Sequence, residues 1–267
     1  SLLRGFSAPI ILEQKVNIEN QTFLFKNDTD TFNKWEAGRN ISIELLISEV
    51  NETTIDLLPY IEALSKIISD ENLDLAYRSL LLTLPSQETI AQSMFERGIV
   101  PDPDKIFTAV TKLELCIAKN LNKQFINTYK NLTFQNSYTP DPRDAGQRSL
   151  RNASLKYITK LDSGKAALEQ FKSADNMTEQ LSALGLIIAA DIKSDCIGDF
   201  YNQWRSDSLV IDKWFAIQIT SAPPKKALKI AKKLSSHVDF NWKNPNRFRS
   251  LIGSFAMMPC SFHMADG

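Results

Sequence analysis

The feature that most restricts the fold of this sequence is a long row of apolar residues repeated with the period of an α-helix. An α-helix has about 3.6 residues per turn, so apolar residues three or four positions apart share one face. Such a face must be buried against other elements, which predicts a long core helix. The row consists of Ile106, Val110, Leu113, Ile117, Leu121 and Phe125.

The same period recurs through most of the chain after about residue 20. Asp30, Ser86 and Asn176 are predicted to cap the N-termini of three helices, and Glu179, three residues after Asn176, completes a capping-box pattern. Pro85 is predicted to stop the helix before it. Further helical patterns cover residues 55–68, 73–84, 150–161, 181–188, 210–217 and 248–256.

One short stretch near the beginning differs from the rest. Residues 8–12, Ala-Pro-Ile-Ile-Leu, are apolar and β-prone, which predicts one strand that needs a sheet from elsewhere. The remaining helices show neither βα alternation nor a strict repeat. The sequence therefore predicts an all-α fold of about a dozen helices that pack pairwise, as a bundle or as a superhelix with a degenerate repeat, preceded by that strand.

Charge and composition exclude several classes of protein. The 31 Lys and Arg balance the 31 Asp and Glu among 267 residues, so no overall field attracts nucleic acid, and no apolar run is long enough to span a bilayer. Three distant cysteines favour a reducing cytoplasm. Seven Asn-x-Ser/Thr sequons would suit secretion, but we interpret them as chance matches in an Asn-rich chain. They begin at Asn20, Asn27, Asn40, Asn51, Asn131, Asn152 and Asn176.

Catalytic motifs are missing from the sequence. Its two histidines, His237 and His263, do not form an HExxH pair, and neither a phosphate-binding loop nor a GxGxxG turn occurs. Composition and spacing alone therefore indicate a mostly helical domain without an identifiable activity.

Two groups of residues near the end of the chain could form sites. A run of lysines is either a solvated helix face or a surface for phosphates or an anionic membrane. Cys260 and His263 form a C-x-x-H pair, which is either a buried thiol beside a hydrogen-bonded histidine or part of a metal or nucleophile site, although two ligands alone cannot hold zinc. The lysines are Lys225, Lys226, Lys229, Lys232 and Lys233.

The segment Asn244–Arg249 is the most informative candidate. Its Asn-Pro-Asn step predicts a turn and a helix start, and Arg247 and Arg249 then fall near the positive end of the helix dipole, where cations are unfavourable. Either the arginines pair inside the fold or they meet carboxylates or carbonyls elsewhere. Gly253, one turn after Arg249, leaves that side uncrowded.

Taken together, ordered segments along almost the whole chain resemble the bacterial aminopeptidase N family, the zinc alanyl aminopeptidases of gluzincin type. The resemblance implies that residues 1–16 end a preceding β-sandwich domain and that residues 17–267 form the C-terminal helical domain, incomplete at its C-terminus. It also implies that this domain is a superhelical array of about a dozen antiparallel-packed helices of degenerate ARM/HEAT type. The segments are Ser1–Pro9, Thr83–Ser86, Leu150–Ala153, Asn176–Thr178, Asp212–Phe215, Asn244–Arg247, Arg249–Phe255, Phe262–His263 and Asp266–Gly267.

Two departures from the family pattern accompany this resemblance. The chain stops at Gly267, where the family continues with further helices, and the turn Met257–Cys260 lacks the asparagine that the family tends to carry. We therefore expect a fragment that ends before the last helices of the domain.

The resemblance also implies a function for the parent protein. That protein would remove N-terminal residues from peptides with a zinc ion and a glutamate base, both held by an upstream domain, so this chain would contain neither a catalytic residue nor a metal site. The helical domain would wall and gate the active-site cavity, with Arg249 facing the cavity and Arg247 and His263 as weaker candidates. Arg247 is the arginine expected to pair within the fold.

The expected partners are the catalytic and β-sandwich domains of the same chain and peptide substrates in the shared cavity, without nucleic acid or a membrane span. The expected location is the cytoplasm, with peripheral attachment to the inner membrane as the alternative. The competing hypothesis for the whole chain is a free-standing α-solenoid adaptor that binds partner proteins.

Overall fold

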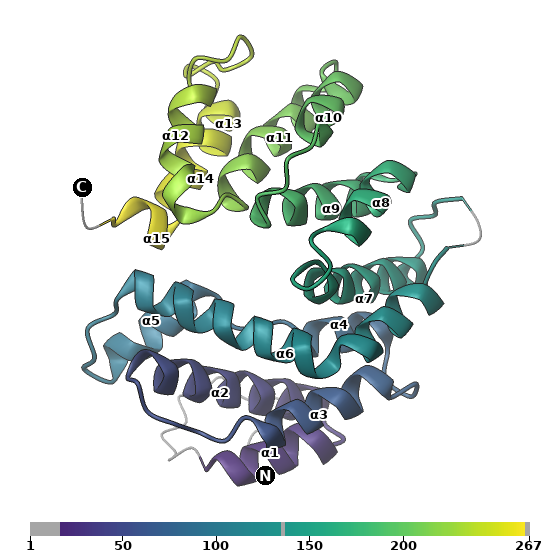
Figure 1. Ribbon diagram of the computed structural model, residues 1–267, viewed down its shortest axis with the longest axis vertical. Helices are drawn as coiled ribbons and strands as arrows, with labels where there is room; N and C mark the ends of the chain where they lie inside the picture. The colour runs from purple at the N-terminus through teal and green to yellow at the C-terminus, as the bar shows by residue number, and fades with distance from the viewer. Residues whose placement is uncertain (1–16, 135–136, 265–267) are drawn as a thin grey trace. The chain divides into compact units, whose positions relative to one another are not determined.

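The structure is a computed structural model that describes residues 17–134 and 137–264 (Figure 1). The described residues form helices and loops and contain no β-strand, which confirms the all-α class for this part of the chain. The strand expected at residues 8–12 lies outside the described residues. None of the described helices is both long enough and apolar enough to cross a membrane.

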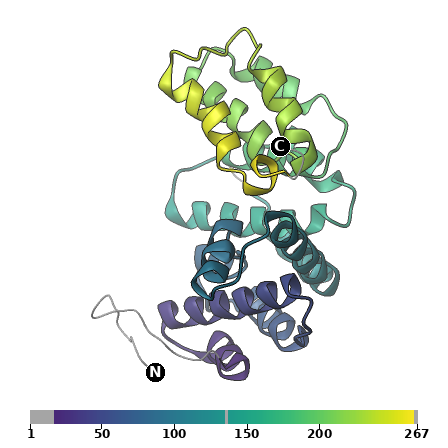
Figure 2. The ribbon, with the colours of Figure 1, turned by 90° about the vertical axis from the view of Figure 1, so that its left-hand side faces the viewer.

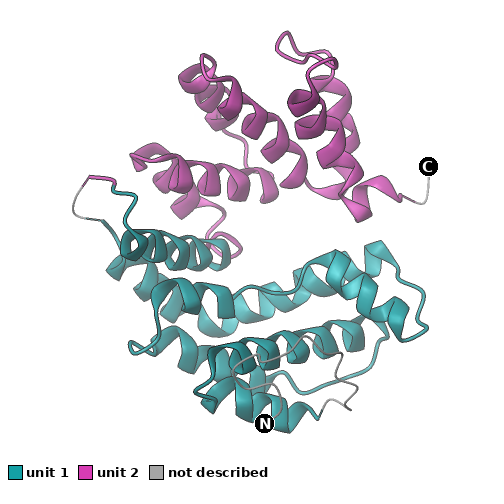
Figure 3. Ribbon diagram, turned by 180° about the vertical axis from the view of Figure 1, so that it is seen from behind, with its two compact units in different colours: residues 1–134, 139–157 teal, residues 135–138, 158–267 magenta. Residues whose placement is uncertain are grey.

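The chain divides into two compact units, coloured separately in Figure 3. Unit 1 consists of residues 1–134 and 139–157, and unit 2 of residues 135–138 and 158–267. Unit 1 contains α1 (Ile18–Asn27), α2 (Thr31–Val50), α3 (Leu58–Ser69), α4 (Leu75–Leu81), α5 (Gln87–Glu96), α6 (Pro103–Asn131) and most of α7 (Pro142–Thr159).

Unit 2 continues the succession of short and medium-length helices to the end of the described chain. A five-residue segment of π-helix, Arg249–Gly253, joins two short α-helices near the end of this unit, and we call it the π-turn. The helices are α8 (Lys165–Ser173), α9 (Met177–Ala189), α10 (Cys196–Trp204), α11 (Ser208–Thr220), α12 (Pro224–Leu234), α13 (Pro245–Phe248), α14 (Ser254–Ala256) and α15 (Pro259–Phe262).

The core of unit 1 lies between layers of helices. Helices α2 and α3 contact α1 on one side and α6 on the other, as Figures 1 and 2 show. Phe125 of α6 stacks on Tyr157 of α7 with ring centroids 4.5 Å apart, and both side chains are almost fully buried. Burying a side chain of this size contributes about 1.5–3 kcal/mol.

The long apolar row indeed forms one face of α6. Of its six residues, all but Val110 are buried, and Val110 is half-buried. The helix is not regular throughout, because Leu121 has non-helical backbone angles (φ −112°, ψ 15°). The buried face continues across this kink, since Phe125 beyond it is 0% exposed.

The predicted N-caps are confirmed. Asp30 accepts a hydrogen bond from the Asn33 amide at the start of α2, and Ser86 accepts one from the Thr89 amide at the start of α5. Asn176 caps α9, as described below. Two predicted helix ends are wrong. Leu161 lies in the turn after α7 and is 37% exposed, because the helix already ends at Thr159. The helix predicted over residues 73–84 covers only Leu75–Leu81 and so ends before it reaches Pro85.

Helix α11 forms the centre of unit 2. It contacts α9, α10 and α12 and also the π-turn. Its residues Phe215 and Ile219 are both 0% exposed. The segment that carries the candidate arginines therefore packs directly on this central helix.

Candidate functional site

Asn244 begins the segment that carries the two candidate arginines. Its side-chain Oδ1 accepts hydrogen bonds from the amides of Asn246 (3.0 Å) and Arg247 (3.3 Å), and Pro245 occupies the first helical position, where no amide is needed. The predicted turn and helix start are confirmed. Helix α13 is only four residues long, so Arg247 lies in its first turn and Arg249 lies just beyond it.

The regular helical stripe expected over residues 248–256 is wrong in one respect. Residues Arg249–Gly253 are π-helical, and the amide of Ser254 donates to the carbonyl of Arg249, five residues back. The wider turn changes which side chains face inward: Leu251 is 0% exposed, whereas Phe248 is 43% exposed. Such π-helical turns often occur at functional sites.

Arg247 lies inside the fold of unit 2. Its Nε donates to Asp212 Oδ1 at 2.6 Å, and its two terminal nitrogens donate to the carbonyl oxygens of Asp239 (3.2 Å) and Ser208 (3.3 Å). The guanidinium also lies over the ring of Phe215, 5.0 Å from its centroid. With its side chain only 7% exposed, Arg247 pairs within the fold, as the sequence analysis expects.

Arg249 is exposed, in contrast to Arg247. No acidic side chain in the described part of the chain pairs with its guanidinium. A Cβ added to Gly253 would lie 3.6 Å from Arg249 Cβ and 3.9 Å from Cγ, so Gly253 lies directly beside this side chain. The π-turn thus presents an unpaired cation at the surface of unit 2.

His263 and Cys260 lie in and after the short helix α15. Cys260 is buried, whereas His263 is exposed and its ring meets the edge of Phe262, with centroids 5.1 Å apart. Among residues 17–134 and 137–264, no group of three or more His, Cys, Asp or Glu side chains could hold a metal ion. The described residues therefore do not fit a zinc ion.

The lysines of α12 do not act as one uniform face. Lys226 forms an ion pair with Asp191. Three others, with Leu228, line a groove of about 490 Å³ whose remaining wall is mainly apolar and comes from α14, α15 and Met264. The groove is lined by Lys225, Leu228, Lys229, Lys232, Phe255, Ser261, Phe262 and Met264.

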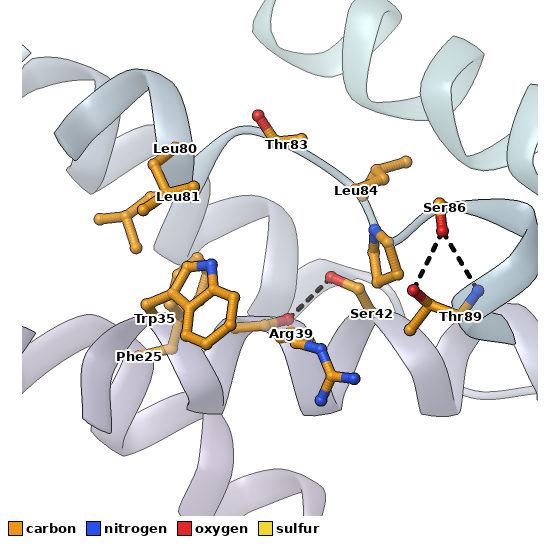
Figure 4. Close-up of a pocket in the computed structure, with 12 residues that line it drawn as sticks. Phe25, Trp35, Arg39, Ser42, Leu80, Leu81, Thr83, Leu84, Ser86 and Thr89 are labelled. Carbon is orange, nitrogen blue, oxygen red and sulfur yellow. Dashed lines mark hydrogen bonds between the residues drawn. The ribbon is translucent and has the colours of Figure 1, made fainter. Parts of the chain in front are cut away.

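Unit 1 contains a separate pocket of about 310 Å³, shown in Figure 4. Trp35 and Arg39 of α2 lie on one side of it, and the loop from Thr83 to Ser86 crosses the other. The polar groups are already engaged: Ser86 caps α5, and Arg39 pairs with Glu36 at 3.3 Å. Burial raises the pKa of the Glu36 carboxyl, opposed by Arg39. This pocket offers binding contacts but pairs no nucleophile with a base.

The sequence analysis did not identify the aromatic cluster around Arg247. His237 packs against the rings of Tyr201, Trp214 and Phe215, with centroids 5.1–5.7 Å apart. Tyr201 donates a hydrogen bond of 2.6 Å to Asp239, and this bond raises the pKa of the Tyr201 hydroxyl. Through Tyr201 the cluster holds Asp239, whose backbone carbonyl accepts a hydrogen bond from Arg247.

Asp212 is the functional neighbour that sequence reasoning missed. It lies within the segment Asp212–Phe215 that contributed to the family resemblance, but nothing in the spacing connects it with Arg247, 35 residues later. The one sign of it in the sequence is that this carboxylate interrupts a largely apolar segment, residues 209–217.

Comparisons with known proteins agree with this architecture. Residues 18–267 match the family model described as "Domain of unknown function (DUF3458_C) ARM repeats". Curated proteins called aminopeptidase N from Caulobacter vibrioides and Escherichia coli are each 33% identical over the whole chain, and the chain spans only 31% of each. A solved structure of Legionella pneumophila aminopeptidase A in complex with aspartic acid superimposes on 98% of this chain and 32% of its own, with a TM-score of 0.85 and 27% identity.

Proposed function

We propose that this chain, which belongs to the DUF3458_C family of ARM-repeat domains, is the C-terminal helical domain of a zinc aminopeptidase that removes N-terminal residues from peptides. The observation that carries this proposal is the pattern of coverage. Relatives called aminopeptidase N match the chain from end to end, yet the chain spans about a third of their length.

The zinc ion would be held outside this chain, because the described residues offer no group of ligands for it. We therefore assign no step of the hydrolysis to these residues. The helical domain would instead wall the cavity in which peptides are cleaved, exclude large folded substrates, and supply groups that hold the peptide away from the scissile bond.

Arg249 is the residue that we assign to peptide binding. Its side chain is exposed, has no acidic partner among residues 17–134 and 137–264, and is carried by the π-turn; a planar guanidinium is well suited to a peptide carboxylate or to backbone carbonyls. His263 is a weaker candidate, because it is exposed but lies at the end of the described chain. Arg247 would support the site from within the fold.

The domain division and the location follow from the same assignment. Residues 1–16 would end a β-sandwich domain, residues 17–267 would belong to the helical domain, and the partners would be the catalytic and β-sandwich domains of the same polypeptide. The enzyme would work in the cytoplasm. A free-standing adaptor is not favoured, because the two relatives named above are aminopeptidases about three times as long as this chain.

The test of this function is Arg249→Ala in the full-length protein. We expect KM for short peptides to rise by about tenfold, which corresponds to a lost charge-assisted contact of about 1.4 kcal/mol, while kcat/KM for an uncharged alanyl amide stays within about twofold. The comparison needs a peptide and its C-terminally amidated form as matched substrates. Equal effects on all three substrates would remove the role assigned to Arg249, and a full-length protein that cleaves none of them would remove the proposed function.

A further inference from the structure

We propose that Asp212 is a positioning residue that fixes the π-turn through Arg247 and thereby sets where Arg249 meets the peptide. This inference rests on the proposed function, because it assigns Asp212 a part in substrate selection through Arg249. Asp212 itself lies in α11, belongs to another segment of the chain, and is not required to touch the substrate.

The first step is the ion pair between Asp212 and Arg247. Its Nε–Oδ1 distance is 2.6 Å, and the two side chains are 18% and 7% exposed. Charge-assisted bonds of this length in a poorly solvated place are strongly directional. The carboxylate therefore fixes one edge of the Arg247 guanidinium.

The second step is the way in which the rest of the guanidinium is held. Its terminal nitrogens donate to the carbonyls of Ser208, at the start of α11, and of Asp239, in the loop before α13, and its face lies on Phe215. These contacts come from two separate segments of unit 2. Arg247 therefore has one orientation, and its backbone is fixed relative to α11.

The third step connects Arg247 with the π-turn. Ser250 Oγ donates to the carbonyl of Arg247 at 2.9 Å, and Leu251 is 0% exposed. Along the chain, Arg249 lies between Arg247 and Leu251, both of which are buried, and Gly253 lies beside its side chain. The backbone that carries the exposed guanidinium is thus held on both sides, although the guanidinium itself has no partner among the described residues.

A purely stabilising role for this ion pair is the competing explanation. Burying two charges costs desolvation that largely offsets their attraction, so such a pair adds little net stability compared with apolar residues of the same size. The geometric specificity of the pair is what apolar residues would not reproduce. We therefore assign the pair to the placement of the π-turn.

The experiment uses Asp212→Asn in the full-length enzyme, with Asp212→Glu as the conservative variant. We expect Asp212→Asn to raise KM for short peptides about five- to tenfold and to leave kcat/KM for the alanyl amide and for the amidated peptide within about twofold. Asp212→Glu keeps the charge and should recover at least half of the loss on a logarithmic scale. A crystal structure of the Asp212→Asn enzyme should show Arg249 displaced from its wild-type position.

Glu114→Gln is the matched control. Glu114 is also a buried carboxylate in an ion pair, with Lys156 at 2.5 Å, but it lies in unit 1. This variant should lower the melting temperature without changing the ratio of peptide to amide activity. If Asp212→Asn does not fold, Arg247→Lys, which keeps the charge but loses the forked contacts, takes its place with the same expected ratio.

The outcomes separate the two proposals. If Arg249→Ala changes the ratio of peptide to amide activity and Asp212→Asn lowers only the melting temperature, the positioning role is wrong and the carboxylate site stands. If Asp212→Asn lowers both activities equally, the positioning role is also wrong. If Arg249→Ala leaves the ratio unchanged, the proposed binding role fails and this inference fails with it.

Discussion

At Gly38, in the middle of α2, the ring of Phe25 lies directly against the helix backbone. A Cβ at this position would be 2.7 Å from Phe25 Cδ2 and 2.9 Å from Cζ, and closer still to Cε2. Phe25 is 1% exposed, and its ring would have to leave its packed position to admit the added methyl group. We expect Gly38→Ala to lower the free energy of unfolding by about 1–3 kcal/mol, measured by urea denaturation.

Gly198→Ala is the matched control for that prediction. Gly198 also lies in a helix, α10, but nothing lies within 4 Å of the position that its Cβ would occupy. This variant should be neutral or more stable by up to about 1 kcal/mol, since alanine favours helix. Equal destabilisation by both substitutions would mean that the contact with Phe25 is not the cause.

Tyr60 gives a prediction for alkaline pH. Its side chain is 3% exposed, its hydroxyl lies 2.9 Å from Ser42 Oγ, and burial raises its pKa from 10.0 to about 12. Since the folded state favours the neutral phenol, this contribution to stability is fully present below pH 10. It is lost as the pH rises to about 12, because only the unfolded chain ionises there.

The test compares Tyr60→Phe with the wild type at pH 8 and pH 11. At pH 8 the variant should lose about 1 kcal/mol for the missing hydrogen bond, although Ser42 still donates to the Gly38 carbonyl at 2.7 Å. At pH 11 the difference should shrink or reverse, because the phenylalanine cannot ionise. Burial also raises the pKa of Tyr157, so the stability of the Tyr60→Phe variant should still fall in part between pH 8 and pH 11. An undiminished difference at pH 11 would contradict this explanation.

At the scale of helices and turns, the start of α9 shows a two-way cap. Asn176 Oδ1 accepts from the Glu179 amide at 3.0 Å, and its Nδ2 donates to the Glu179 carboxylate at 2.9 Å. We expect Asn176→Ala to lower the free energy of unfolding by about 0.5–2 kcal/mol and Asn176→Gly by only a few tenths. Chemical denaturation of the three proteins measures this order, and a glycine variant as unstable as the alanine variant would contradict the capping role.

Caps and turns of this kind could be predicted because their causes lie within a few residues. Asn176 and Glu179, or Ser86 and Thr89, meet through local helix geometry alone. The π-turn has its cause elsewhere: Arg247 is held by Asp212 in α11 and by the Asp239 loop, and neither contact follows from a helical period. A pattern of 3.6 residues therefore predicts an ordinary helix at residues 248–256 and misses the irregular turn that presents Arg249.

At the scale of the whole molecule, the repeated amphipathic helices are sufficient to predict an all-α chain, because each helix must bury one face against its neighbours, but they leave open whether the helices form a bundle or a superhelix. The function is not contained in those faces. Arg249 is singled out by the family resemblance and not by a helical pattern, and no group of three or more His, Cys, Asp or Glu side chains among the described residues could hold zinc. The function is therefore indicated by the family resemblance over the whole chain and not by local sequence patterns.

The last prediction concerns how zinc and activity divide along the full-length protein. We expect the full-length protein to retain about one zinc ion per chain after dialysis, as a catalytic zinc site would. The polypeptide of residues 1–267 should retain none and should hydrolyse no alanyl amide, because residues 17–134 and 137–264 contain no set of metal ligands and the sequence has no HExxH pair. Metal analysis and a fluorogenic amide assay on both proteins measure this. Peptide cleavage by residues 1–267 alone, or a native gene product of only this length, would contradict the assignment of this chain as the non-catalytic wall of a larger enzyme.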